Sequence, residues 1–207
     1  MNAEVEPGTH AFRDVVLKRR SIRRYRSEPV PREVIEGLLE AAIWSPSAHN
    51  RQPWRFAVVE TDMQKETLAQ AMGERLRRDL QADGVPAEVI EMDAGRSYSR
   101  ITRSPVLVVL CLSMVDMDVY SDEKRSLNEY LMAVQSVAMA GQNILLAAHD
   151  VGLGACWMCA PLFCPDVVKA TLNLPDDWQP QALLTIGYPA ETREKTRKLL
   201  EASVVWR

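Results

Sequence analysis

The chain has 207 residues, of which 47% are hydrophobic and 26% are charged, so it can bury one sizeable core. Its formal net charge is −3, which gives no electrostatic reason to expect a nucleic acid or an anionic membrane as a partner. We therefore expect a single domain over residues 1–207 that acts on small molecules.

The first part of the chain predicts two helices on either side of a basic segment. Phe12 and Val16 have helical spacing, and Pro31 stands at the first turn of a second apolar stripe. Between them, residues 19–23 read Arg-Arg-Ser-Ile-Arg. Guanidinium groups match phosphate oxygens and serine adds a short donor, so this basic segment predicts a phosphate site. A solvated basic helix end is the ordinary alternative.

A small polar loop follows the second helix. Pro46, Ser47 and Asn50 are usual turn residues and could simply end that helix. Next to a phosphate site, however, a polar loop of this kind suits the edge of a flat polar ring. The two segments together therefore indicate a flavin mononucleotide (FMN) site. His49 either touches a substrate or only caps the turn.

Two apolar runs, residues 55–60 and 105–112, have the composition of strands, and the second shows no alternation and is expected to be central. Between them, residues 64–80 and 86–100 read as charged helices without a thick apolar face. We interpret about residues 62–103 as a peripheral excursion that forms a lid or a substrate wall.

Residues 127–151 predict a long helix that is apolar on nearly every side and must be buried all round. Its polar positions, such as Gln135 and Asn143, disfavour a membrane span. One domain rarely encloses such a helix, so a homodimer interface is expected to cover the remaining face. Residues 155–158, 167–172 and 182–187 add strand, helix and strand. The expected class is α+β, with a mainly antiparallel sheet and helices on both faces.

The four cysteines include the pair Cys156 and Cys159, but the sequence supplies no second ligand pair for zinc. We expect reduced, buried thiols and no metal site. Residues 1–9 contain Glu4 and Glu6 and no apolar run, so no export signal is expected. A cytoplasmic protein is the resulting expectation.

Four segments in order resemble the nitroreductase family of FMN-dependent oxidoreductases. They are the basic segment, the polar loop, the run Gly-Leu-Gly-Ala-Cys-Trp at residues 152–157, and a C-terminal part with Gly-Tyr-Pro at 187–189 and Lys-Thr-Arg at 195–197. The resemblance implies a nitroreductase-like homodimer that binds FMN. The cofactor contacts that it implies are Arg19, Arg20, Ser21, Arg23, Pro46, Ser47, Asn50, Trp157, Met158, Cys159, Lys195 and Arg197.

The resemblance also implies roles for these residues. The loop with Pro46, Ser47 and Asn50 comes from the partner subunit and bonds the edge of the flavin ring. The backbone of Trp157, Met158 and Cys159 passes along the flavin, although a plain core strand is the alternative reading. Lys195 and Arg197 meet the phosphate, with a solvated basic tail as the alternative.

The chemistry expected from the resemblance is hydride transfer. A flavin accepts hydride at N5 and gains negative charge near N1 and C2=O, where Arg23 is the expected cation. No nucleophile and base pair is needed, so no side chain is assigned as catalytic. Gly152 and Gly154 lack the third glycine of a dinucleotide fingerprint. We therefore expect NAD(P)H to dock transiently over the flavin, with ping-pong turnover.

A finer resemblance is to the C-terminal flavin domain of bifunctional coenzyme F420 biosynthesis proteins, whose other half is an F420 γ-glutamyl ligase. It rests on residues 77–87, on the Gly-Leu-Gly segment and on residues 174–180. It implies reduction of a dehydro-F420-like deazaflavin. The charged helices of the excursion would then contact this substrate, with Asp79 as the candidate residue, whereas a solvated face is the ordinary alternative for helices of this charge density. A general NAD(P)H-dependent nitro or quinone reductase, and a non-catalytic flavin or deazaflavin carrier, are the alternatives.

Overall fold

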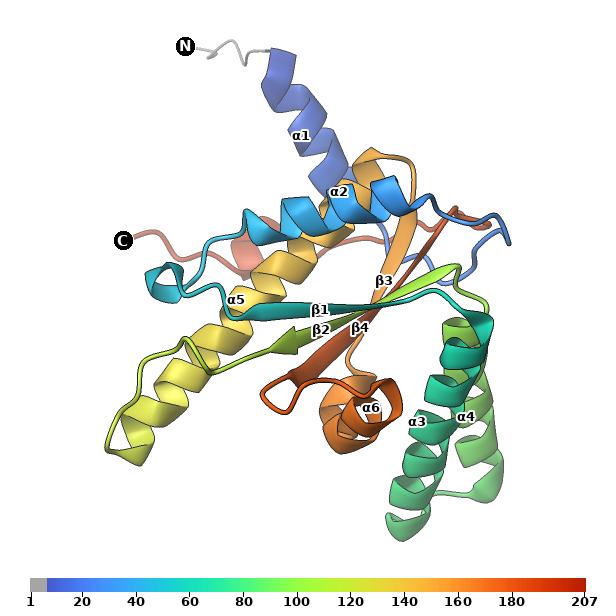
Figure 1. Cartoon of the computed structure of the whole chain (residues 1–207). Coiled ribbons are helices and arrows are strands. Elements are labelled where there is room, and N and C mark those ends of the chain that lie inside the picture. Colours follow the sequence, from blue (N-terminus) through green and yellow to red (C-terminus); the bar gives the residue numbers. More distant parts are fainter. Residues whose placement is uncertain (1–6) are drawn as a thin grey trace.

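The protein is described by a computed structural model that places residues 7–207, with side chains from Phe12 onward. Residues 1–6, on which the expectation of no export signal partly rests, lie outside the described residues. The helices, shown in Figure 1, are α1 (Pro7–Lys18), α2 (Arg32–Ile43), α3 (Asp62–Ala82), α4 (Ala87–Thr102), α5 (Glu123–Asp150) and α6 (Pro165–Leu172). The strands are β1 (Trp54–Val59), β2 (Val106–Leu112), β3 (Gly154–Met158) and β4 (Gln179–Gly187), with short 3-10 turns η1 (Ala48–Asn50), η2 (Ala160–Phe163) and η3 (Leu200–Ala202).

The strands form one antiparallel sheet in the order β1-β2-β4-β3. All seven residues of β2 are buried, as expected for a central strand without alternation. β3 lies at the edge, where the Ile22 N–H donates to the Ala155 carbonyl at 3.0 Å and Ser21 forms a parallel bridge with Ala155. The basic segment is therefore fixed along this edge. The predicted α+β class with a mainly antiparallel sheet is confirmed.

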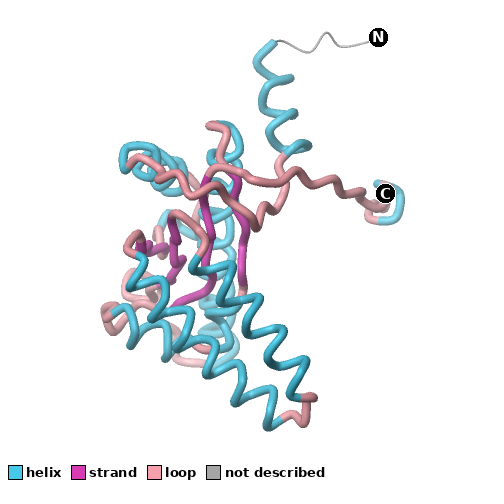
Figure 2. Tube along the Cα trace, turned by 90° about the vertical axis from the view of Figure 1, so that its right-hand side faces the viewer, coloured by secondary structure: helices cyan, strands magenta, loops and turns pink. Residues whose placement is uncertain are grey.

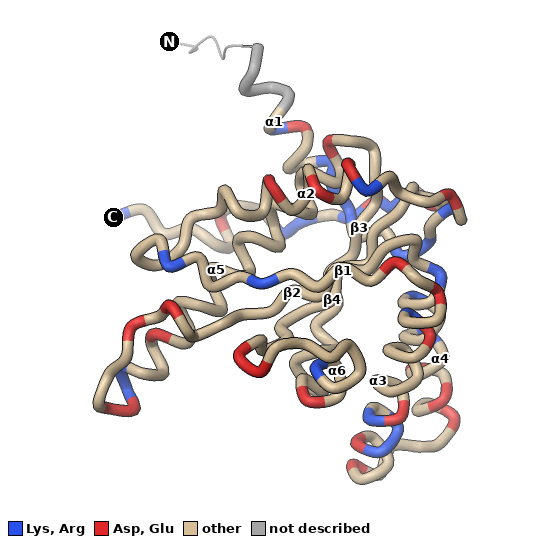
Figure 3. Tube along the Cα trace, viewed as in Figure 1, with Lys and Arg blue, Asp and Glu red and all other residues tan. Residues whose placement is uncertain are grey.

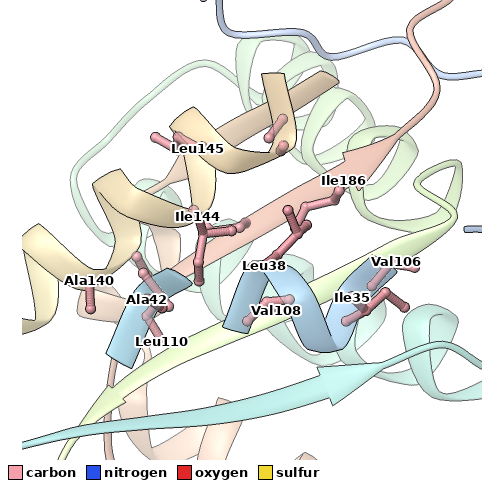
Figure 4. Packing of buried hydrophobic residues seen from close by; sticks show 14 of the residues in the cluster. Ile35, Leu38, Ala42, Val106, Val108, Leu110, Ala140, Ile144, Leu145 and Ile186 are labelled. Atoms are coloured by element: carbon pink, nitrogen blue, oxygen red, sulfur yellow. The ribbon is translucent and has the colours of Figure 1, made fainter. Parts of the chain in front are cut away.

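Helices cover both faces of the sheet. α2 and α5 pack on one face, and Figure 4 shows Leu38 of α2 and Ile144 of α5 packed among the side chains of β2 and β4. On the other face, Leu68 of α3, Ile101 of α4 and Val168 of α6 form the second core cluster. Both clusters share the sheet, so the described chain is organised around one layer of strands.

The α3 and α4 pair differs from the thin, peripheral excursion that the sequence suggested. Leu68 and Ile101 are fully buried, and the buried Lys65 donates its ammonium protons to the Ser104 carbonyl at 3.0 Å. The base of the pair therefore belongs to the core. The average hydropathy of the two helices is low, but apolar residues at the end next to the sheet are buried. Its far end projects away from the sheet, as Figure 2 shows. Only that end could move as a lid.

Helix α5 begins four residues before the predicted start because Asp122 caps it, its carboxylate accepting the Arg125 N–H at 2.9 Å. The helix is long and apolar enough to cross a membrane by composition, but it packs on the sheet as the core helix of a soluble fold. One face remains uncovered within the chain, and Leu127, Leu131 and Met139 are exposed there. Within one chain, α5 is therefore buried on the side that faces the sheet and not on all sides as predicted.

Candidate cofactor and substrate site

The backbone of the basic segment is fixed by contacts with the sheet. Ile22 is buried, and a Cβ on Gly154 would lie only 2.7 Å from the Ile22 Cβ, so β3 needs glycine at this approach. The Tyr25 hydroxyl lies 2.5 Å from the Ile22 carbonyl oxygen and 2.8 Å from the Thr185 carbonyl oxygen. Burial raises the pKa of Tyr25, which keeps the hydroxyl protonated. These contacts fix the backbone that carries the arginines.

The basic segment after α1 and the segment at residues 193–197 meet in a cleft of about 200 Å³, which we call the basic cleft. It is lined by Arg19, Arg20, Ser21, Arg23, Arg193, Lys195 and Arg197. Six of these seven residues are ones that the sequence predicted as FMN contacts, and Arg193 is the addition. Figure 3 shows Lys and Arg positions gathered where the segment after α1 reaches β3 and α4. Residues 19–23 and 193–197 are thus brought together.

The basic cleft contains donors that the described residues do not satisfy. The Nε atoms of Arg19 and Arg20 are buried without a hydrogen-bond partner. Burial lowers the pKa of Arg19, and the like charges of Arg197 and Arg20 lower it further. Positive groups held this close need an anion for balance. The residues present therefore fit a phosphate group such as that of FMN.

A larger cavity of about 600 Å³ adjoins the basic cleft and shares Arg23 and Arg193 with it. We call it the arginine cavity, and its lining consists of Arg23, Arg24, Tyr25, Arg96, Ser99, Arg100, Arg103, Ala190 and Arg193. Burial lowers the pKa of Arg100, and the charges of Arg23, Arg96 and Arg193 lower it further. None of the described residues in this lining is acidic.

Sequence reasoning missed the contribution of α4 to this cavity. Arg96, Arg100 and Arg103 are spaced by four and three residues, so they share one helix face. That spacing was a readable signal, but the charge density of the helix favoured the interpretation as a solvated face. The fold turns this face toward Arg23.

One carboxylate, Glu191, lies at the boundary of the two spaces. It accepts the Arg23 backbone N–H at 2.8 Å and pairs with the Arg193 guanidinium at 2.8 Å. Burial works against its ionisation, but these two donors outweigh burial and hold the pKa of Glu191 below its usual value. Glu191 therefore anchors the C-terminal segment to the basic segment.

The segment at residues 157–159 lies at the far end of β3. Trp157 and Met158 pack against the two core clusters, as the plain core reading expected for their side chains. Cys159 is exposed, and its sulfur accepts the Trp157 Nε1–H at 3.1 Å. The expectation of buried thiols is therefore wrong for Cys159, although Cys111, Cys156 and Cys164 are buried. No metal-binding group of His, Cys, Asp or Glu occurs among the described residues.

The polar loop lies at the opposite end of α2 from the basic segment. The twelve residues of α2 separate the two by about 18 Å along the helix, and neither the basic cleft nor the arginine cavity is lined by Pro46, Ser47, His49 or Asn50. His49 and Asn50 have φ angles of 50° and 55°, a conformation that costs free energy and is common at functional sites. Within one chain the two predicted halves remain apart.

The two predicted substrate contacts do not share a space in this chain. Asp79 is exposed at the rim of an apolar pocket of about 260 Å³, together with Phe163 and Cys164. This pocket lies between α3 and the turn that follows β3. His49 lies in the polar loop, at the surface.

The family model described as "Nitroreductase family" matches residues 16–188. The chain belongs to this family. A protein from Thermus thermophilus named NADH dehydrogenase is 32% identical over 216 aligned positions, covering 92% of this chain and 93% of that protein. A Bacillus subtilis protein named as an NAD(P)H nitroreductase, YfhC, is 25% identical and covers 90% of this chain and 89% of its own length.

Solved structures agree with this assignment. A nitroreductase from Desulfovibrio desulfuricans, in complex with FMN, has a TM-score of 0.72 and 26% identity, covering 99% of this chain and 98% of that one. A BluB-like flavoprotein from Clostridium difficile has a TM-score of 0.80 at 21% identity, covering 94% of this chain and 98% of that one, which speaks for the fold alone. The nitroreductase fold is therefore established, and the chain is an oxidoreductase of this family.

Proposed function

We propose that this protein is an FMN-dependent oxidoreductase that passes hydride from NAD(P)H through the flavin to a small acceptor such as a nitro compound or a quinone. The observation that carries the proposal is the basic cleft, where Arg19 and Arg20, with their buried and unpartnered Nε atoms, meet Lys195 and Arg197. FMN in the related Desulfovibrio structure supports the choice of cofactor.

Different residues would bind the two ends of the cofactor. Arg19, Arg20 and Ser21, with Lys195 and Arg197, would hold the phosphate. Arg23 and Arg100 both line the arginine cavity and would stabilise negative charge at the polar edge of the ring. Bound FMN would supply two-electron hydride chemistry at N5. The backbone at residues 157–159 would lie along the ring.

The proposed unit is a homodimer with two composite sites. Exposed apolar side chains occupy the projecting helix α1, the free face of α5 and the C-terminal tail, among them Phe12, Leu131, Leu200 and Trp206. α1 and the tail extend from the body in Figures 1 and 2. Pairing two chains would cover this surface. It would also bring Pro46, Ser47 and Asn50 of one chain to the flavin ring of the other.

For the acceptor, the comparisons favour a general reductase over a deazaflavin enzyme, because relatives carry NADH dehydrogenase and NAD(P)H nitroreductase names. A dehydro-F420-like substrate stays as the second candidate, with Asp79 and the projecting end of α3 and α4 as its contacts. The pocket beside Asp79 supports a substrate wall at that place. A non-catalytic flavin carrier is the third candidate. We place the protein in the cytoplasm.

The test is the cofactor content and turnover of the purified protein. We expect about one FMN per chain, and NAD(P)H oxidation that depends on added nitroaromatic or quinone. Protein that FMN cannot saturate would refute the cofactor assignment. Bound FMN without turnover on nitroaromatics, quinones or the deazaflavin precursor would favour the carrier.

A further inference from the structure

The two connected spaces hold more positive charge than the proposed cofactor can neutralise. FMN has one phosphate, for which the basic cleft already offers Arg19, Arg20, Lys195 and Arg197. Arg23 and Arg100 are assigned to the ring edge. Arg24, Arg96 and Arg103 also line the arginine cavity, and FMN supplies no further anion for them.

Ion pairs within the chain occupy only some of the cavity arginines. Arg96 pairs with Asp93 and Arg193 pairs with Glu191. Arg24 and Arg103 form no salt bridge with any residue that the structure describes. Neither guanidinium is held in an ion pair, although Arg24 lies near enough to Glu191 to help lower the pKa of that carboxyl. Arg103 reaches the cavity from the C-terminal cap of α4, and Arg24 reaches it from the segment between Ile22 and α2.

The size and charge of the cavity restrict what it suits. About 600 Å³ lies within the usual range for sites that take small organic ligands. Like charges at fixed positions repel one another, and the lowered pKa of Arg100 reflects that repulsion together with burial. A ligand with several phosphate or carboxylate groups would remove the repulsion, whereas a neutral nitroaromatic or quinone would not. The charged ligand of this cavity is therefore a different molecule from a neutral acceptor.

We propose that the arginine cavity binds the phosphate-rich part of the nicotinamide donor and makes NADPH the preferred donor over NADH. The inference rests on the proposed function, because the donor must lie next to the flavin. NADPH differs from NADH by one phosphate dianion on the adenosine ribose. Guanidinium forks bind phosphate oxygens in pairs, so Arg24 and Arg103 are the residues that would recognise it.

The experiment compares kcat/KM for NADPH and NADH with a fixed quinone acceptor. Arg24→Ala and Arg103→Ala each remove one exposed cavity arginine, and Arg78→Ala removes an exposed arginine of α3 outside the cavity as the matched control. The wild type should prefer NADPH. Each cavity variant should lower kcat/KM for NADPH by about tenfold and leave the NADH value nearly unchanged. Arg78→Ala should change neither value.

Inhibition by 2′,5′-ADP, which has the adenosine phosphates but no nicotinamide, should weaken in the same two variants. Equal use of NADPH and NADH by the wild type would overturn the inference, as would a preference that survives in the Arg24→Ala/Arg103→Ala double variant. Tri-glutamate binding that depends on Arg103, without 2′,5′-ADP binding, would assign the cavity to a polycarboxylate and also overturn it. In each case, retained FMN and turnover keep the proposed function intact, whereas wild-type protein that lacks both refutes that function itself.

Discussion

The two ends of α2 carry the two halves of the proposed site, and they are supported in different ways. The basic segment before α2 is bonded into the sheet edge through Ile22 and Tyr25 and meets its own C-terminal segment. The polar loop after α2 is held by a local bond from the Gln52 N–H to the Ser47 hydroxyl at 3.1 Å and by one bond to α5, from the Ala48 N–H to the Ser136 hydroxyl at 3.3 Å. On our proposal, the phosphate end is built within one chain, while the ring end requires a second chain.

The largest effect is expected from a variant that prevents two chains from forming the dimer. Leu131→Glu places a charge on the uncovered face of α5, where the side chain is 47% exposed. Burying an unpaired carboxylate in an interface costs several kcal/mol, so the variant should be monomeric and lose about a hundredfold or more in kcat/KM. Light scattering and acceptor-dependent turnover measure the two effects.

Met92→Glu is the matched control, because Met92 is an exposed apolar residue of α4 away from α5. It should remain dimeric and active. A monomeric Leu131→Glu protein with wild-type turnover would contradict the need for a second chain.

The phosphate end is tested by Arg20→Ala. Removing one charged donor should weaken FMN binding by about 1.5–3 kcal/mol, without changing the oligomeric state. Fluorescence titration of the apoprotein with FMN gives the value. Arg13→Ala, on the exposed side of α1, controls for the loss of a positive charge and should bind FMN normally. Equal FMN affinity in both variants would remove Arg20 from the site.

The ring end should show a smaller effect. Asn50→Ala removes an amide that the proposal places at the flavin edge, and an uncharged hydrogen bond contributes about 0.5–1.5 kcal/mol. Because the positive φ of Asn50 suits asparagine better than alanine, Asn50→Gly serves as a second variant that relieves the backbone. Turnover lowered in both variants supports a flavin contact. If Asn50→Gly has full turnover, only the backbone conformation matters there.

Much of the fold and the phosphate end could be predicted from the sequence because their signals are local. The unbroken apolar run of β2 predicts a buried central strand, and the order Arg-Arg-Ser-Ile-Arg predicts a site for an anion. The part of α4 in the arginine cavity was missed, because the helical spacing of Arg96, Arg100 and Arg103 suits a solvated face equally well until the chain folds them near Arg23. The base of α3 was likewise hidden, because Leu68 is one of few apolar residues in a charged helix.

The composite site is tested most directly by mixing two defective chains. In a heterodimer of an Arg20→Ala chain and an Asn50→Ala chain, a shared site predicts that both defects fall in one site and the other site is intact. Purified heterodimer, carrying two different affinity tags, should then recover close to half of the wild-type turnover at limiting FMN. If both sites were built within single chains, each would carry one defect. Turnover at the average of the two parent homodimers would therefore contradict the account.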